Sequence, residues 1–80
     1  MRLEVLLFGI TKDIIGEDRH EIELNSNTSV AELKKLLIDR YPKLEKLNSL
    51  LVAVNNEYGN DDLRLKAGDE IALIPPVSGG

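Results

Sequence analysis

The first half of the chain alternates between apolar and polar positions in ways that predict two strands. Residues 3–10 are apolar at most positions, which indicates a central strand with a helix over at least one face. Residues 20–25 alternate, with Ile22 and Leu24 expected inward and two glutamates outward, as in a half-exposed strand. The segment between them, residues 11–19, contains a glycine and an acidic pair and predicts a loop or a wide hairpin turn.

Residues 30–40 follow the period of an amphipathic helix. Ser29 followed by Glu32 is a capping-box sequence, worth about 1 kcal/mol at a helix start. Pro42 ends the helix, because the residue before a proline avoids the helical conformation. Residues 43–50 are ambiguous and allow a single helical turn held by two leucines. The apolar stripe expected to face the sheet consists of Val30, Leu33, Leu36 and Leu37.

The second half predicts three further strands. Residues 51–55 form one, a short strand at 57–58 follows an Asn-Asn turn, and residues 70–74 follow a Gly-Asp turn. Leu63 and Leu65 are expected to point inward. The first and last strands are the most apolar, so we expect them to be adjacent in the middle of the sheet. With one helix across a face, the pattern predicts an α+β, ubiquitin-like (β-grasp) roll: a mixed sheet of four or five strands with one main helix.

Composition indicates a single ordered domain. The chain has 80 residues, of which 42% are hydrophobic and 30% charged, a balance typical of globular proteins. We expect a ubiquitin-like domain at residues 1–74 and an extended C-terminal tail at residues 75–80. The net charge of −4 argues against nucleic-acid binding, which depends mainly on cations that neutralise phosphates.

The sequence lacks the residues of several kinds of site. It has no cysteine, which excludes disulfides, thiolate nucleophiles and cysteine-ligated metals. His20, its one histidine, has no second metal ligand at suitable spacing, so we expect a surface position and no metal site. It contains no signal peptide and no apolar run of about 18 residues, so a cytoplasmic location without membrane contact is expected.

The final six residues are the candidate site. Two prolines fix φ and cannot continue a strand ladder, so the chain is expected to leave the domain in an extended direction. The residues after them are small, which suits a narrow channel in a partner better than a hydrophobic core. An unstructured terminus would explain a bare Gly-Gly ending but not the whole motif. The tail comprises Pro75, Pro76, Val77, Ser78, Gly79 and Gly80, and the Gly80 carboxylate is the expected reactive group.

Four parts of the chain together resemble a known family. They are Leu7-Phe8-Gly9, residues 28–33, Ala53-Val54-Asn55 with Glu57-Tyr58, and Gly68-Asp69-Glu70 leading into Ile74 and the tail. On these residues the chain resembles the small subunit of molybdopterin synthase, the MoaD-type sulfur carriers of the MoaD/ThiS ubiquitin-like family. The chain departs from the family pattern in two places. Lys12-Asp13 stands where an Arg-Glu pair is common, and Ile74 stands where an aromatic residue often precedes the prolines.

The resemblance implies a function in molybdenum cofactor biosynthesis. In this family an E1-like (MoeB-type) adenylyltransferase uses ATP to adenylate the terminal glycine, and a sulfur donor converts it to a thiocarboxylate. The tail then enters the large (MoaE-type) subunit, where sulfur passes to cyclic pyranopterin monophosphate to build the dithiolene. Gly79 and Gly80 would carry this chemistry. The chain would be a protein co-substrate, the non-catalytic small subunit, with no bound cofactor of its own.

Two other functions use the same ending. A ubiquitin-like protein modifier would be joined to lysines through Gly80, and a sulfur carrier could instead supply thiamine synthesis or tRNA thiolation. In each case the tail residues 75–78 would contact the partner. Phe8 and Ile74 lie on strands expected to be neighbours, where they either form part of an apolar docking patch or fill the core. Lys12 either pairs with an acidic group of a partner or is solvated.

Overall fold

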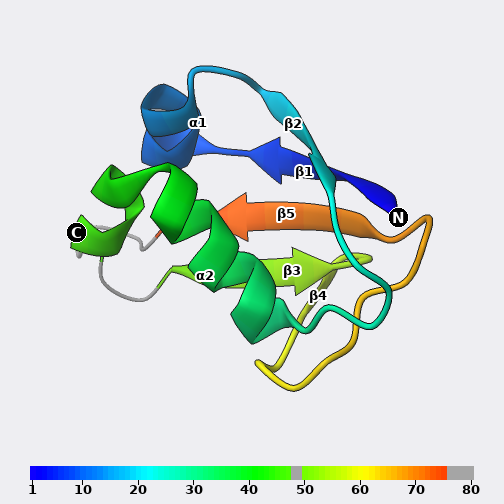
Figure 1. Cartoon of the computed structure of the whole chain (residues 1–80). Coiled ribbons are helices and arrows are strands. Elements are labelled where there is room, and N and C mark those ends of the chain that lie inside the picture. The colour runs from blue at the N-terminus through cyan, green and yellow to red at the C-terminus, as the bar shows by residue number, and fades with distance from the viewer. Residues whose placement is uncertain (48–49, 76–80) are drawn as a thin grey trace.

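Five strands form one mixed sheet in the order β2-β1-β5-β3-β4, and the longer helix lies across one face of it (Figure 1). The computed structural model describes residues 1–47 and 50–75. The strands are β1 (Arg2–Leu7), β2 (Arg19–Glu23), β3 (Leu51–Val54), β4 (Glu57–Tyr58) and β5 (Glu70–Ile74), and the helices are α1 (Gly9–Ile15), α2 (Val30–Arg40) and the 3-10 helix η1 (Pro42–Lys46). None of the helices in these two ranges combines the length and the apolarity needed to cross a membrane.

The first and last strands occupy the middle of the sheet, as the sequence predicts. β1 and β5 run parallel, with Leu7 opposite Leu73. β2 pairs antiparallel with β1 on one side, and β3 pairs antiparallel with β5 on the other. The predicted α+β roll with one main helix is therefore confirmed, and its mixed sheet has five strands.

The core lies between α2 and one face of the sheet. Strand side chains alternate between faces, so every second residue of the central strands points toward α2. Val30, Leu33 and Leu37 of α2 are fully buried, as predicted. Leu36, expected in the same stripe, is only half-buried, because it lies at a surface hollow beside Leu24. The sheet contributes Leu3, Val5, Leu7, Ile22, Val52, Val54, Ile71 and Leu73 to the core.

The two leucines before β5 differ in burial. Leu65 is buried as predicted, whereas Leu63 is 42% exposed, so the inward position expected for Leu63 is wrong. A turn interrupts the extended chain there, with the Leu63 N–H donating to the carbonyl oxygen of Asn60. The Leu63 carbonyl in turn accepts the N–H of Val30 at 3.0 Å. The backbone carbonyl of Leu63 therefore accepts an N–H from the first turn of α2 that has no partner within the helix, while the Leu63 side chain stays near the surface.

Helix α1 occupies the segment where the sequence predicts a continued strand and then a loop. β1 ends at Leu7, and the buried Thr11 organises the helix start: its Oγ1 accepts the N–H of Phe8 at 3.1 Å. Gly16 ends the helix with φ +87°. A helix of seven residues is too short for a clear apolar period. The available signal was the pair Ile14-Ile15, which packs against the core, followed directly by glycine at the C-terminal cap.

The capping box at the start of α2 is formed as predicted. The N–H of Glu32 donates to Ser29 Oγ at 3.2 Å, and the N–H of Ser29 donates to Glu32 Oε1 at 3.2 Å. Glu32 Oε1 also accepts the Ser29 hydroxyl at 3.0 Å. The two bonds that this carboxylate accepts lower the pKa of Glu32, with the backbone N–H of Ser29 making the largest contribution, followed by its hydroxyl. The carboxylate form of Glu32 is therefore the form that stabilises this helix start.

Ser29→Ala is expected to lower the free energy of unfolding at neutral pH by about 1 kcal/mol, because a helix N–H loses its acceptor. Since the pKa of folded Glu32 lies below its ordinary value of 4.5, its contribution is present at neutral pH and is lost as the pH falls through the folded-state pKa. The difference between the two proteins should therefore shrink in acid. Urea denaturation of both proteins at neutral pH and in acid measures this difference in the free energy of unfolding. Glu32→Gln is the control, because it removes the charge of the carboxylate. A difference that stays constant in acid would contradict the role of the Glu32 carboxylate.

Candidate functional site

Strand β5 ends where the predicted tail begins. Of the predicted site residues, Phe8, Ile74 and Pro75 belong to the described part of the chain. The reactive group and the domain boundary after residue 74 stay predictions. The structure describes the residues around the end of β5, which we call the base of the tail. The predicted site residues outside the described ranges are Pro76, Val77, Ser78, Gly79 and Gly80.

The first turn of α1 packs against the end of β5 and forms this base. A Cβ atom placed on Gly9 would stand 3.3 Å from Cγ of Pro75, and Gly9 has a φ of +54° that favours glycine. Thr11 Oγ1 lies 3.5 Å from the carbonyl oxygen of Leu73, 62 residues further along the chain. The start of α1 therefore braces the last residues of the domain on the side where the tail begins.

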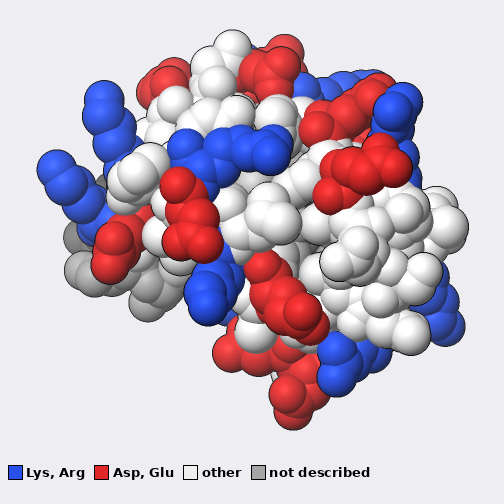
Figure 2. Space-filling view, in the orientation of Figure 1, with Lys and Arg blue, Asp and Glu red and all other residues white. Residues whose placement is uncertain are grey.

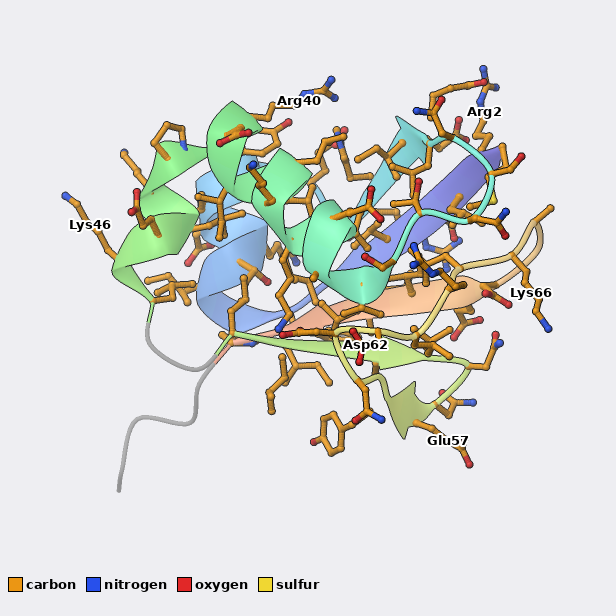
Figure 3. The ribbon with its side chains drawn as sticks, turned by 60° about the horizontal axis from the view of Figure 1, so that its bottom comes forward. Arg2, Arg40, Lys46, Glu57, Asp62 and Lys66 are labelled. Atoms are coloured by element: carbon orange, nitrogen blue, oxygen red, sulfur yellow. The ribbon has the colours of Figure 1, made fainter. Side chains whose placement is uncertain are left out.

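Apolar side chains also continue across the sheet face that α2 leaves uncovered. Leu6 pairs with Ala72, Ala72 with Ala53, and Ala53 with Tyr58, so these four residues form a row across β1, β5, β3 and β4. They alternate along their strands with core residues and so point to the opposite face. In Figure 3, α2 lies above the sheet, while β4 with the labelled Glu57 extends below it.

A second apolar row lies beside the first. Leu51 pairs with Ile74, and Phe8 follows β1 in an extended conformation that turns its side chain to the face opposite the buried Leu7. Phe8 is 50% exposed, Leu51 42% and Tyr58 70%. Ile74 is half-buried, and neither Phe8 nor Ile74 belongs to the core cluster. Of the two alternatives for Phe8 and Ile74, the core position is therefore wrong. We call the surface formed by both rows the open-face patch. It consists of Leu6, Phe8, Leu51, Tyr58, Ala72 and Ile74 around Ala53, which is itself buried at 7% exposure.

A charged pair borders the open-face patch. Lys12 Nζ lies 2.6 Å from an oxygen of Asp18, and the pKa of Lys12 is raised, first by this hydrogen bond and then by the charge of Asp18. Both side chains are exposed, beside a hollow of about 470 Å³ that Phe8, Gly9 and Arg19 also line. Lys12 thus has a carboxylate partner within its own chain.

On the face that carries α2, acidic and basic side chains are interspersed (Figure 2).

His20 differs from the prediction of a surface residue. Its side chain is 14% exposed, and Nδ1 lies 2.6 Å from a carboxylate oxygen of Glu17. Its ring meets that of Tyr41 edge to face, with centroids 5.8 Å apart. His20 therefore joins the turn after α1 to the end of α2 and has a structural role. Within residues 1–47 and 50–75, no cluster of three His, Cys, Asp or Glu side chains is arranged to hold a metal ion.

Comparison with known sequences gives matches over the whole chain. The profile of the ThiS family matches residues 5–80. The molybdopterin synthase sulfur carrier subunit of Caenorhabditis briggsae is 36% identical over 81 residues, which span 98% of this chain and 96% of that protein. The protein of the same name from Dictyostelium discoideum is 40% identical over 84 residues, with 99% and 96% of the two chains covered.

Solved structures match equally fully. A Pyrococcus furiosus protein assigned as molybdopterin converting factor, subunit 1, superposes with a TM-score of 0.87 at 28% identity, covering 96% of this chain and 99% of that one. SAMP1 from Haloferax volcanii, a small archaeal modifier protein, has a TM-score of 0.83 at 27% identity with both chains fully covered. A chain from the complex of subunits 1 and 2 of the Helicobacter pylori molybdopterin-converting factor has a TM-score of 0.68 at 33% identity, again with full coverage. The sequence and the fold therefore match the same group of proteins.

Proposed function

The chain belongs to the ThiS family, and we propose that it is a sulfur carrier of molybdenum cofactor biosynthesis whose Gly80 is adenylated and then thiocarboxylated. The observation that carries the proposal is full-length similarity to proteins named molybdopterin synthase sulfur carrier subunit. The tail motif supports it, because Gly79 and Gly80 stand at the end of a segment without bulky side chains. The proposal requires Gly80 to be the last residue of the mature protein.

The chemistry needs an activated carboxylate. A carboxylate is a poor electrophile until one oxygen becomes part of a leaving group, and attack on ATP provides this by forming the acyl-adenylate and pyrophosphate. A sulfur donor then displaces AMP and leaves a thiocarboxylate on Gly80. The sulfur then forms a bond to cyclic pyranopterin monophosphate, and hydrolysis of the acyl–sulfur bond by water returns the carboxylate. The acid–base and anion-stabilising groups must come from the partner enzymes, since the tail has none.

Two partners follow from this cycle. The first is a large subunit, as in the Helicobacter pylori complex of subunits 1 and 2, and the second is an E1-like, MoeB-type adenylyltransferase that consumes ATP. We assign the open-face patch, including Phe8 and Ile74, to docking, and residues 75–78 to the channel through which the tail reaches a partner active site. The chain itself would need no bound cofactor, and we place the cycle in the cytoplasm.

Intact mass spectrometry tests the proposal. The purified chain is incubated with an E1-like adenylyltransferase, ATP and a sulfur donor, and its mass is compared with that of a sample without ATP. The expected result is an ATP-dependent mass increase that corresponds to one oxygen replaced by sulfur at Gly80. An unmodified protein, or a native mass that extends beyond Gly80, would overturn the proposal.

A second candidate function is protein modification through an amide bond between Gly80 and a lysine. The similarity to SAMP1, a small archaeal modifier protein, favours it. Both functions begin with the same adenylate, so activation does not separate them. Lysine-linked conjugates in extracts of the native cells would support modification, whereas co-purification with a large subunit would support sulfur transfer. A carrier that supplies sulfur to another thiolation pathway would give neither lysine-linked conjugates nor co-purification with a large subunit.

Gly9→Ala is expected to slow adenylation of Gly80 roughly tenfold, because the new Cβ would press on Pro75 and redirect the tail. The positive φ of Gly9 should also cost about 1–2 kcal/mol of stability with any side chain. Gly16→Ala is a matched control: its φ is +87°, but its Cβ would meet nothing within 4 Å. Adenylation assays and urea denaturation of both variants separate the two effects. Equal adenylation rates for the two variants would show that Gly9 does not position the tail.

A further inference from the structure

The outer edge of β2 presents unused backbone groups. β2 pairs with β1 and with no other strand of the described residues. The N–H of Leu24 donates to the carbonyl oxygen of Met1, and the N–H of Leu7 donates to that of Asp18, so the even-numbered residues of this segment turn their backbone groups toward β1. In an antiparallel ladder the residues between them turn theirs away. The residues whose N–H and C=O groups face outward are therefore Arg19, Glu21 and Glu23.

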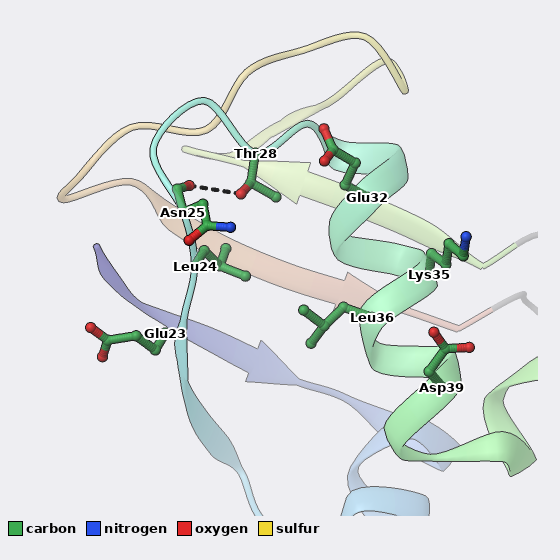
Figure 4. A pocket seen from close by; sticks show the side chains of 8 residues that line it. All are labelled: Glu23, Leu24, Asn25, Thr28, Glu32, Lys35, Leu36 and Asp39. Carbon is green, nitrogen blue, oxygen red and sulfur yellow. Dashed lines mark hydrogen bonds between the residues drawn. The ribbon is translucent and has the colours of Figure 1, made fainter.

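A hollow runs beside this edge, between β2 and α2 (Figure 4). Its volume is about 410 Å³, and a second hollow of about 360 Å³ further along β2 shares Glu23 in its lining. In the larger hollow, Leu24 of the segment after β2 and Leu36 of α2 point toward each other, while Glu23 points away from them. The half-burial of Leu36 is thus explained by its position in this hollow. Charged side chains of α2 line the rims of the two hollows: Glu32, Lys35, Asp39 and Arg40.

We propose that this edge is a docking site for an extended peptide of a partner protein, with alternating aliphatic and basic residues, that adds to β2 as a further strand. Main-chain hydrogen bonds to Arg19, Glu21 and Glu23 would hold such a peptide, and its side chains would alternate between the two faces of the sheet. Residues on the hollow side would meet Leu36, which is half-buried, next to Leu24, which is only 5% exposed, and this favours aliphatic side chains.

The charges on the other side of the edge favour basic residues. An added strand would place every second side chain beside Arg19, Glu21 and Glu23. Of these, Arg19 is already paired with Glu4 at 3.5 Å. Within the chain the carboxylates of Glu21 and Glu23 share one cation, Arg2, at 3.7 Å and 3.6 Å. A lysine or arginine of the peptide would supply the second cation. The α2 rim does not alter this preference, because it carries two acidic and two basic side chains.

A second copy of the chain is the other occupant to consider for this edge. Pairing two β2 strands antiparallel about a two-fold axis through Glu21 would set the two Glu21 carboxylates against each other, but it would also place each Arg19 opposite Glu23 of the other copy, so the charges of β2 alone do not oppose it. The net charge of −4 on each copy does oppose the approach of two chains. The proposed site uses neither the tail nor the open-face patch, so it goes beyond the sulfur-carrier function and does not depend on it.

NMR titration of the ¹⁵N-labelled full chain tests the site with a synthetic octapeptide that alternates valine or isoleucine with lysine. The expected result is chemical-shift change along β2 and the facing side of α2, together with slowed exchange of the Arg19, Glu21 and Glu23 amide protons. A peptide with glutamate in place of lysine should bind at least about tenfold more weakly. Shift changes centred on the open-face patch, or equal affinity for the acidic peptide, would overturn the proposal.

Two substitutions at one position sharpen the test. Glu21→Pro removes an outward N–H without touching the ladder to β1 and should weaken peptide binding about tenfold, whereas Glu21→Gln, which keeps the N–H, should weaken it less. Adenylation of Gly80 should be unchanged in both, which separates this site from the proposed function. Circular dichroism checks that both variants fold. If either variant fails to fold, the NMR titration of the unmodified chain still tests the proposal. Unchanged peptide affinity in a folded Glu21→Pro variant, or self-association through β2 without peptide, would contradict the proposal.

Discussion

Deleting Gly80 is expected to abolish adenylation and sulfur transfer while leaving the fold intact. The terminal carboxylate would then belong to Gly79 and lie about 3.5 Å short of its place in the partner active site. A misplacement of 1 Å can cost about 100-fold in rate, so the loss should be at least that large. Among the described residues the core ends at Leu73, so circular dichroism and urea denaturation should match those of the full chain. Intact mass after incubation with the activating enzyme, ATP and a sulfur donor measures the modification.

Changes on either side of Gly80 provide the controls. One alanine added after Gly80 converts its carboxylate into an amide and should be equally inactive. Gly79→Ala keeps the carboxylate in place but adds a Cβ that would meet the channel wall, so a partial loss is expected. Ser78→Ala adds no bulk and should retain most activity. Sulfur transfer by the deletion variant at a rate near that of the full chain would mean that the Gly80 carboxylate is not the reacting group.

Leu51→Asp is expected to weaken binding of the large subunit by at least about 30-fold, the effect of losing 2 kcal/mol at an interface hot spot. Leu51 pairs with Ile74 and lies in the open-face patch next to the strand that leads into the tail. A carboxylate there would have to be desolvated when a partner covers the patch. Isothermal titration calorimetry with a molybdopterin synthase large subunit measures the loss.

Leu63→Asp is the matched control for this experiment. Leu63 has the same exposed fraction as Leu51, 42%, but belongs to the segment near the start of α2 and not to the open-face patch. Because the two side chains are exposed to the same extent, the two substitutions should lower the free energy of unfolding by similar amounts, which urea denaturation checks. If both variants bind the large subunit with the affinity of the unmodified chain, the docking role of the patch is wrong.

Local sequence patterns were sufficient for most of the fold. Helix α2 spans the residues that its capping box, apolar stripe and Pro42 predict. Each of these signals depends on residues that are at most four positions apart in the sequence, so no tertiary contact is needed to recognise them. The Asn-Asn turn before β4 is similarly local: Asn55 and Asn56 have φ of 52° and 69°, values that asparagine tolerates well. The missed helix α1 depends instead on Thr11, a polar residue whose burial no apolar period reveals.

Short-range periodicity was enough to predict the strands and the main helix, and residue types at the C-terminus were enough to single out the Gly80 carboxylate, whereas the chemistry expected of the tail came from the family resemblance. The surfaces that the fold presents depend instead on tertiary structure. Three features each bring together residues from different elements: the two rows of the open-face patch, the closeness of Gly9 to Pro75, and the packing of His20 against Tyr41. Such neighbours depend on strand pairing and register, which are set by how the whole chain buries one face of its sheet against α2.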